Sequence, residues 1–289
     1  MIPRIGPTGV TALLISILFS ACVTTGPGGE KSFILISDAD EANLGKQVDS
    51  EVRKENKVLP DTAWQAYVNE VGGRIVKVCD RPNLDYQFHV IASDQVNAFA
   101  LPGGHVYFYA GLLRLMDNES EMAAVMAHEI SHVVARHSVK SLQATYGGVI
   151  GLQLLLGNKS EGAAGQLAGA VLGTAMSGYS RSHELEADKF GVYYMQQAGY
   201  NPNAALTMFD KLGKLTGDKK RGFFENLSAS HPDTPVRIEK VQAQVAAMPR
   251  SVDTLPLYED RYQKMKKRLP LVVSGVEPPP APDSTKQGK

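Results

Sequence analysis

A short run in the middle of the chain carries residues that could bind a metal ion and activate water. Residues 127–132 read AHEISH, so His128 and His132 stand four positions apart with Glu129 beside the first. Four residues turn about 400° around a helix, so both imidazoles leave one face and can share an ion. Zinc accepts neutral imidazoles, and its catalytic sites combine three protein ligands with water. The motif predicts a zinc hydrolase in which Glu129 is the general base for a metal-activated water.

A third ligand is expected from a second segment further along the chain. Residues 179–191 read YSRSHELEADKFG and offer four candidates, His183, Glu184, Glu186 and Asp188. On a helix Glu184 and Asp188 share a face, whereas Glu186 points elsewhere. One carboxylate can complete the zinc ligands while another holds a ligand histidine in the required tautomer. Residue types alone leave all four open, because charged side chains on helices are often only solvated.

Taken together, the two segments resemble one peptidase family. HExxH followed by SRxxExEADxxG is similar to the HtpX and CAAX-prenyl-protease family of gluzincins, and most to its soluble periplasmic lipoprotein members of the LoiP and BepA type. This resemblance implies one zinc ion held by His128, His132 and Glu184, with Asp188 as a carboxylate behind the ligands. Glu186 would have no direct role at the metal.

Two further segments match the family. Just upstream of the active helix lies a run of four residues, Asn97, Ala98, Phe99 and Ala100. In gluzincins an edge strand in this place pairs with an extended substrate backbone, although strand pattern alone is equally compatible with a core hairpin. In the segment SHPDTPVRI, the resemblance makes His231 a candidate that reaches the zinc or stabilises the oxyanion, with Arg237 as its support. By itself, a histidine before a proline is usually a turn residue.

The remaining histidines show no pattern of partners. His89 lies in a segment of alternating polarity, and His105 follows a Pro-Gly-Gly turn. His137 is expected to cap the C-terminal end of the active helix, where a cation is favoured. We assign none of the three a catalytic role.

The elements around the motif are expected to form an α+β domain. Hydrophobic periodicity and capping residues predict helices over 40–56, 61–78 and about 118–137, and strands over 86–91 and within 96–109. Asn118 or Ser120 can cap the active helix. The expected fold is a mostly helical zincin-like metallopeptidase domain with a small β-sheet beside the HExxH helix.

The two ends of the chain differ in composition from its middle. Residues 1–21 carry a short basic start, an apolar stretch and small residues, which is typical of a signal peptide. The run LFSAC resembles a bacterial lipoprotein box, so residues 22–30 are expected to be a lipidated flexible tether. Residues 270–289 are rich in Pro, Ser and Lys and predict a disordered tail. Without an internal repeat, residues 31–269 are interpreted as one metallopeptidase domain.

These features predict export to the bacterial periplasm and a lipid anchor on Cys22 in the outer membrane. Val23 stands where an aspartate would resemble an inner-membrane retention signal. Lipidation of Cys22 would leave Cys79 without a cysteine partner. A Cys22–Cys79 disulfide would instead exclude lipidation. Residues 162–180 lack charged side chains, but their glycines argue against a transmembrane span.

The balanced charge of the chain argues against a partner that binds through a large excess of one charge, such as nucleic acid. Lys+Arg and Asp+Glu both number 30, so no basic excess points to nucleic acid. We expect a zinc metalloendopeptidase whose partners are protein or peptide substrates, namely unfolded or misassembled envelope proteins, and the outer-membrane protein assembly machinery. The alternative is a latent protease that acts mainly as a non-proteolytic envelope chaperone or assembly lipoprotein, with His231 in the open position of the zinc. The intact Glu129 favours the enzyme.

Overall fold

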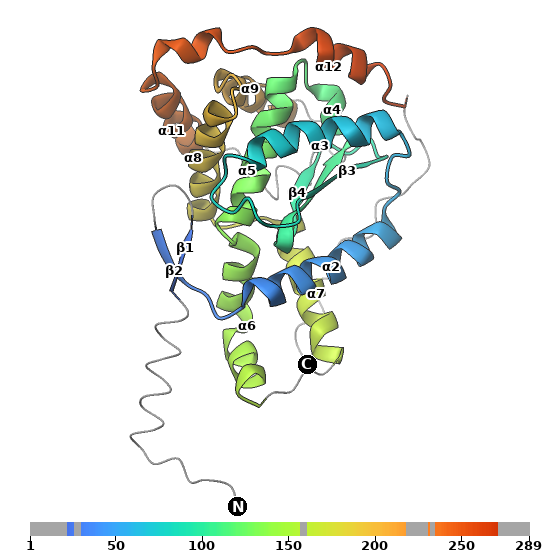
Figure 1. The fold of residues 1–289 in the computed structure, drawn as a ribbon, viewed down its shortest axis with the longest axis vertical. Helices are drawn as coiled ribbons and strands as arrows, with labels where there is room; N and C mark the ends of the chain where they lie inside the picture. Colours follow the sequence, from blue (N-terminus) through green and yellow to red (C-terminus); the bar gives the residue numbers. More distant parts are fainter. Residues whose placement is uncertain (1–21, 26–29, 157–160, 218–230, 232–234, 271–289) are drawn as a thin grey trace, which may run out of the picture.

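The computed structural model describes residues 22–25, 30–156, 161–217, 231 and 235–270. The expected signal peptide over 1–21 and all but the first residue of the expected tail lie outside the described residues. The described part is mostly helical, with a three-stranded sheet packed among helices and a separate two-stranded sheet at its side (Figure 1). The expected α+β class is confirmed.

The helices and strands follow one another in an order that places the sheet before the active helix. The strands are β1 (Cys22–Thr25), β2 (Glu30–Phe33), β3 (Gln87–Ile91), β4 (Ala98–Ala100) and β5 (His105–Tyr109). The helices are α2 (Asp38–Glu55), α3 (Thr62–Val76), α4 (Ala110–Leu115), α5 (Glu119–Val134), α6 (His137–Leu156), α7 (Glu161–Ser177), α8 (Arg181–Gln197), α9 (Asn203–Gly217), α11 (Pro235–Ala246) and α12 (Glu259–Lys266), with short 3-10 helices η1 (Pro102–Gly104) and η2 (Arg250–Thr254).

The main sheet has the order β3-β5-β4 and separates two hydrophobic cores. β3 runs parallel to β5, and β4 runs antiparallel to it. Because side chains alternate along a strand, Val106 and Phe108 of β5 join the core under α3 and α5. Tyr107 and Tyr109 join a second core under α2 and α7, on the opposite side of the sheet (Figure 1).

The active helix α5 begins where the sequence predicts and ends three residues early. The side chain of Asn118 caps it by accepting the backbone N–H of Glu121 at 2.9 Å. Its far end is set by Arg136, which has a left-handed φ of 57° and a guanidinium only 2% exposed. His137 therefore begins α6, and the prediction that it caps α5 is wrong because this corner turns the chain first.

Arg136 is held in place from the N-terminal side of the domain. Its guanidinium donates to the backbone oxygen of Ile36 at 2.6 Å and pairs with Glu41 of α2 at 2.9 Å. Glu41 is 1% exposed and also pairs with Arg81 at 2.9 Å. A buried charge network thus ties α2 to the corner after α5.

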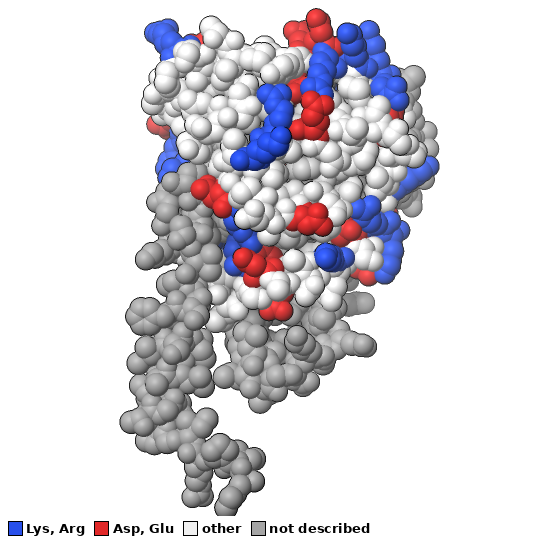
Figure 2. Space-filling view, viewed as in Figure 1, with Lys and Arg blue, Asp and Glu red and all other residues white. Residues whose placement is uncertain are grey.

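The N-terminal part of the described chain contains a pair of β-strands that the sequence did not predict. β1 pairs antiparallel with β2, within and just after the range for which we expected a flexible tether. Cys79 is a free, buried thiol. Among the described residues, no helix combines the length and the hydrophobicity needed to cross a membrane. On the face shown in Figure 2, basic and acidic side chains lie next to one another, in line with the zero formal net charge.

Candidate active site

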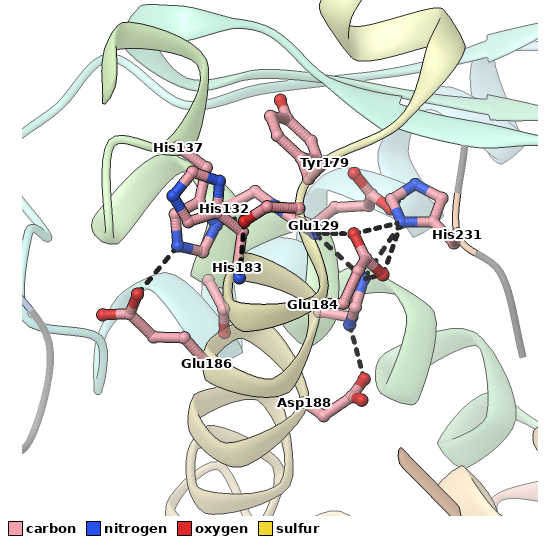
Figure 3. A network of polar contacts seen from close by, with 12 residues as sticks. Glu129, His132, His137, Tyr179, His183, Glu184, Glu186, Asp188 and His231 are labelled. Carbon is pink, nitrogen blue, oxygen red and sulfur yellow. Dashed lines mark hydrogen bonds and ion pairs between the residues drawn. The ribbon is translucent and has the colours of Figure 1, made fainter. Parts of the chain in front are cut away.

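Two packed helices and one loop residue bring the predicted metal ligands together (Figure 3). In α5, the Nε2 atoms of His128 and His132 lie 3.0 Å apart. Glu184, in the first turn of α8, places carboxylate oxygens 3.5 Å and 3.4 Å from those two nitrogens. Nδ1 of His231 lies 3.1 Å from both oxygens of Glu184 and 3.3 Å from Nε2 of His128. The four donor groups point toward one centre.

The close approach of α8 to α5 depends on a glycine. A Cβ on Gly191 would lie 3.1 Å from the backbone nitrogen of His128 and 3.4 Å from the carbonyl carbon of Ala127. Gly191 stands seven residues after Glu184, about two helical turns, so it lies on the same face of α8. The missing side chain allows that face to reach the histidines.

Charge and donor types fit a divalent cation. With neutral imidazoles, the carboxylates of Glu129, Glu184 and Asp188 and the guanidinium of Arg237 sum to a charge of −2, and all four residues are buried. Buried charges require a compensating partner. Among the described residues, Oε2 of Glu129 and Nε2 of His231 have no hydrogen-bond partner despite their burial. Imidazoles with a carboxylate are the ligands that zinc prefers in catalytic sites.

Protonation in the cluster follows from burial and charge. Burial lowers the pKa of His132 far below its usual value, which leaves the ring in the neutral form that binds metal. Burial opposes ionisation of Glu184, but His231 and His128 outweigh it and lower its pKa. For His128, burial is outweighed by Asp188 and Glu184, which raise its pKa to about 10. A metal ion must therefore displace a proton from His128.

Glu129 stands beside the ligand cluster rather than within it. Burial raises the pKa of its carboxyl, and His231 and His128 only partly oppose this effect. The backbone N–H of Ala100 in β4 donates to this carboxylate. Nε2 of His231 lies 3.5 Å from Oε1 of Glu129. A raised pKa moves a carboxylate toward the range in which it exchanges protons at neutral pH.

Asp188 lies behind the ligands, and Arg237, which was expected to support His231, pairs with Asp188. An oxygen of Asp188 lies 3.0 Å from Nδ1 of His128. Arg237 of α11 donates from Nε and Nη2 to the two oxygens of Asp188, both at 2.7 Å, and its Nη1 lies 2.9 Å from Glu184. Arg237 therefore contacts the carboxylates of Asp188 and Glu184, and Glu184 in turn faces Nδ1 of His231.

Sequence reasoning missed a second group behind the ligands. Nδ1 of His137 lies 2.8 Å from Nδ1 of His132, and Nε2 of His137 lies 3.0 Å from Oε2 of Glu186. The ring of Tyr179 stacks on that of His132 with centroids 4.2 Å apart. The only available signal was the spacing HxxxxH, which does not bring two residues together on a continuous helix; the corner at Arg136 does.

The expected substrate strand lies at the edge of the sheet, next to Glu129. Backbone bonds to β5 from Asn97 and Leu101 fix the ladder, so Ala98 and Ala100 direct their backbone groups away from β5. Residues 97–100 are buried. The edge of β4 that faces away from β5 therefore lies on the Glu129 side, and in this state it is buried.

Asp49, His89 and His105 form another group of metal-ligand types, on the α2 side of the sheet. Nη2 of Arg53 lies 2.7 Å from Nε2 of His89, and Asp49 accepts hydrogen bonds from Arg53 and Tyr107. The guanidinium already supplies the positive charge that a metal would bring. We interpret this group as a structural hydrogen-bond network.

An apolar pocket opens beside the catalytic cluster. His128 and Glu129 stand at its polar end, and its walls are formed by Leu112, Val125, Met195, Met208 and Phe209. A pocket with an apolar lining and a few convergent polar groups is typical of a site that binds a side chain next to a reacting bond.

Comparison with known proteins identifies the family. Residues 62–245 match Peptidase family M48. The chain is 32% identical to the beta-barrel assembly-enhancing protease of Escherichia coli K12 over 186 residues, which are 61% of this chain and 38% of that protein. It is 31% identical over 201 residues to the mitochondrial metalloendopeptidase OMA1 of Schizosaccharomyces pombe, covering 69% of this chain and 58% of the relative.

A third relative matches over nearly its whole length. The metalloprotease YcaL of Escherichia coli K12 is 28% identical over 267 residues, 82% of this chain and 98% of that protein. By contrast, the chain spans less than two thirds of the length of the first two relatives. The family resemblance drawn from the two motifs is confirmed. The chain belongs to peptidase family M48, a family of metal-dependent peptidases.

Proposed function

We propose that the protein is a zinc-dependent metalloendopeptidase that hydrolyses peptide bonds of unfolded or misassembled envelope proteins. One observation carries the proposal. His128, His132 and Glu184 place donor atoms within 4.8 Å of one another in a largely buried cluster, and the carboxylate of Glu129 stands beside them. These three residues would hold the zinc, which leaves Glu129 free to act as a base.

The chain's own residues divide the reaction between them. Bound zinc would supply Lewis-acid polarisation of the scissile carbonyl and lower the pKa of a water molecule. Glu129 accepts a proton from that water at a carboxylate oxygen and then delivers it to the leaving amine. The N–H of Ala100 holds this carboxylate in position. Nε2 of His231 faces Glu129 and can donate to the oxyanion that develops on the carbonyl.

Asp188 and Arg237 prepare His128 for metal binding. Because Asp188 accepts from Nδ1–H of His128, the ring must offer Nε2 to the metal. The two hydrogen bonds from Arg237 keep Asp188 ionised and fixed. Mutating Asp188 or Arg237 should weaken zinc binding although all three ligand residues are retained.

The edge of β4 supports an extended protein substrate. The N–H groups of Ala98 and Ala100 already donate to side chains, those of Asn97 and Glu129. An unfolded segment can therefore add to the sheet edge through the carbonyl groups of Ala98 and Ala100, with little sequence preference. The neighbouring apolar pocket can take one hydrophobic side chain. Such recognition selects polypeptides with exposed backbone, as unfolded proteins have.

A glutamine at the base position tests the reaction. The Glu129→Gln variant should bind one zinc ion as the wild type does, and should cleave casein or an unfolded outer-membrane protein about 10²–10⁴ times more slowly. Glu239→Gln, an exposed acid on α11, is the matched control and should cleave normally. A zinc-loaded Glu129→Gln protein with normal cleavage would contradict the assignment.

A specific observation favours a second candidate, a latent protease with a mainly non-proteolytic role in outer-membrane protein assembly. His231 approaches Glu184 and His128 closely enough to be a fourth ligand, and the strand edge is buried. A relative is named as an assembly-enhancing protease. The His231→Ala variant separates the readings: it cleaves casein faster if His231 closes the site, and more slowly if His231 stabilises the oxyanion.

We also propose that the chain is exported to the periplasm and anchored in the outer membrane by lipid on Cys22. The lipoprotein-like run before Cys22 supports this proposal. Metabolic labelling with palmitate should mark the wild type and not Cys22→Ala, and the variant should be recovered in the soluble periplasmic fraction. Equal labelling of both proteins would refute the anchor.

A further inference from the structure

A chain of three groups runs from a proposed zinc ligand to a carboxylate that does not touch the metal cluster (Figure 3). His132 meets His137 at 2.8 Å through their Nδ1 atoms, and His137 meets Glu186 at 3.0 Å through Nε2. His132 and His137 are almost completely buried. The contacts therefore connect α5, the start of α6 and α8 in one line.

The order of donors and acceptors in this line is fixed by chemistry. If Nε2 of His132 offers its lone pair to zinc, Nδ1 of the same neutral ring carries the proton. This N–H can only donate to Nδ1 of His137, which must then be the acceptor. The proton of His137 consequently stands on Nε2 and is donated to Glu186. The tautomer of His132 therefore fixes the tautomer of His137, and Glu186 accepts the last hydrogen bond of the line.

Stacked rings hold this line in position. Tyr179 lies against His132, and His183 lies against His137, each with centroids 4.2 Å apart. The hydroxyl of Tyr179 is itself hydrogen-bonded to Ser138 at 2.7 Å. The two imidazole planes are thus fixed independently of the metal.

We propose that His137 is a positioning residue for the metal centre, which orients His132 and transmits the charge of Glu186 to it. The two histidine ligands are then supported differently. His128 donates directly to the carboxylate of Asp188, whereas His132 reaches a carboxylate only through a second imidazole. A carboxylate behind a ligand histidine fixes its tautomer and increases its basicity. This inference rests on the proposed zinc function.

The test is zinc affinity, measured by competition with a chromogenic chelator. His137→Leu removes the acceptor and should weaken zinc binding about 10–100-fold. His137→Asn offers an amide oxygen near the place of Nδ1, so it should restore much of the affinity while cutting the link to Glu186. His89→Gln replaces a buried histidine on β3, away from the metal cluster, and is the matched control, with wild-type affinity. The melting temperature of each metal-free protein reports any general damage.

A double-mutant cycle distinguishes transmission through His137 from a direct effect of charge. Glu186→Gln should weaken zinc binding in the wild-type background and leave it unchanged in the His137→Asn background. The same loss in both backgrounds, or wild-type affinity in His137→Leu, would overturn the inference. Failure of the proposed zinc site would give another result: the wild type would bind no zinc, or His132→Ala would bind zinc normally.

Discussion

His89 on β3 gives a test of buried electrostatics away from the active site. Its side chain is 8% exposed, and its Nε2 accepts from Arg53 at 2.7 Å, so the ring is neutral in the folded protein. Burial, and then the positive charge of Arg53, lower the pKa of His89 from 6.5 to about 4, although Asp49 opposes them. His105 faces the same ring from β5 and contributes to this lowering of the pKa.

The sign follows from comparing the folded and unfolded states. As the pH falls below the unfolded value of 6.5, the unfolded chain takes up a proton that folded His89 refuses until about pH 4. The stabilisation is complete above pH 6.5 and is lost as the pH falls toward 4. Each unit of pKa difference corresponds to about 1.4 kcal/mol, so the full loss is about 3 kcal/mol, and about 2 kcal/mol of it falls between about pH 7 and pH 5.

The perturbation is His89→Gln, because a glutamine oxygen can take the place of Nε2 and accept from Arg53 without titrating. Urea unfolding of both proteins between about pH 5 and pH 7 gives the free energy of unfolding at each pH. The wild type should lose about 2 kcal/mol more than the variant over this range, since His105 and all other groups are common to both. Parallel pH profiles would refute the reasoning.

Three further predictions concern packing, buried charge and metal. Glu41→Ala leaves Arg81 and Arg136 without their buried partner and should reduce the free energy of unfolding in urea by about 3–5 kcal/mol. Gly191→Val should push α8 away from α5, reduce that free energy by about 1–3 kcal/mol and weaken zinc binding, whereas Gly213→Ala, with open space around the new Cβ, should not destabilise the protein or change zinc affinity. Removing zinc with a chelator should lower the melting temperature, and adding zinc should restore it, because a ligand at about 1,000 times its Kd stabilises the folded state by about 4 kcal/mol. A melting temperature that does not respond to zinc would contradict the metal centre.

Local signals were sufficient for the elements that carry the site. Asn118 and the apolar face of α5 define a helix whose start is correctly predicted, and HExxH then requires its two histidines to share a face. The same local reasoning could not choose among the acids of α8. That choice depends on how α8 packs against α5, which Gly191 permits through a contact far away in sequence.

The group around His137 could not be predicted because it depends on one backbone angle. A helix continued through Arg136 would carry His137 away from His132, as the sequence pattern implied. The positive φ at Arg136 interrupts the helix, and it is stabilised by ion pairs with residues about a hundred positions earlier. Neither propensity nor hydrophobic periodicity contains that information.

The corner at Arg136 makes the N-terminal helix part of the catalytic unit. If α2 separated from the domain, the buried guanidinium of Arg136, between the HExxH helix and His137, would lose its partners. We therefore expect α2 and the corner after α5 to unfold as one cooperative segment. Ligands that tighten the metal site should then slow amide hydrogen exchange in α2, although α2 contributes no residue to the catalytic cluster. Changes at the start of the domain can thus affect catalysis through stability alone.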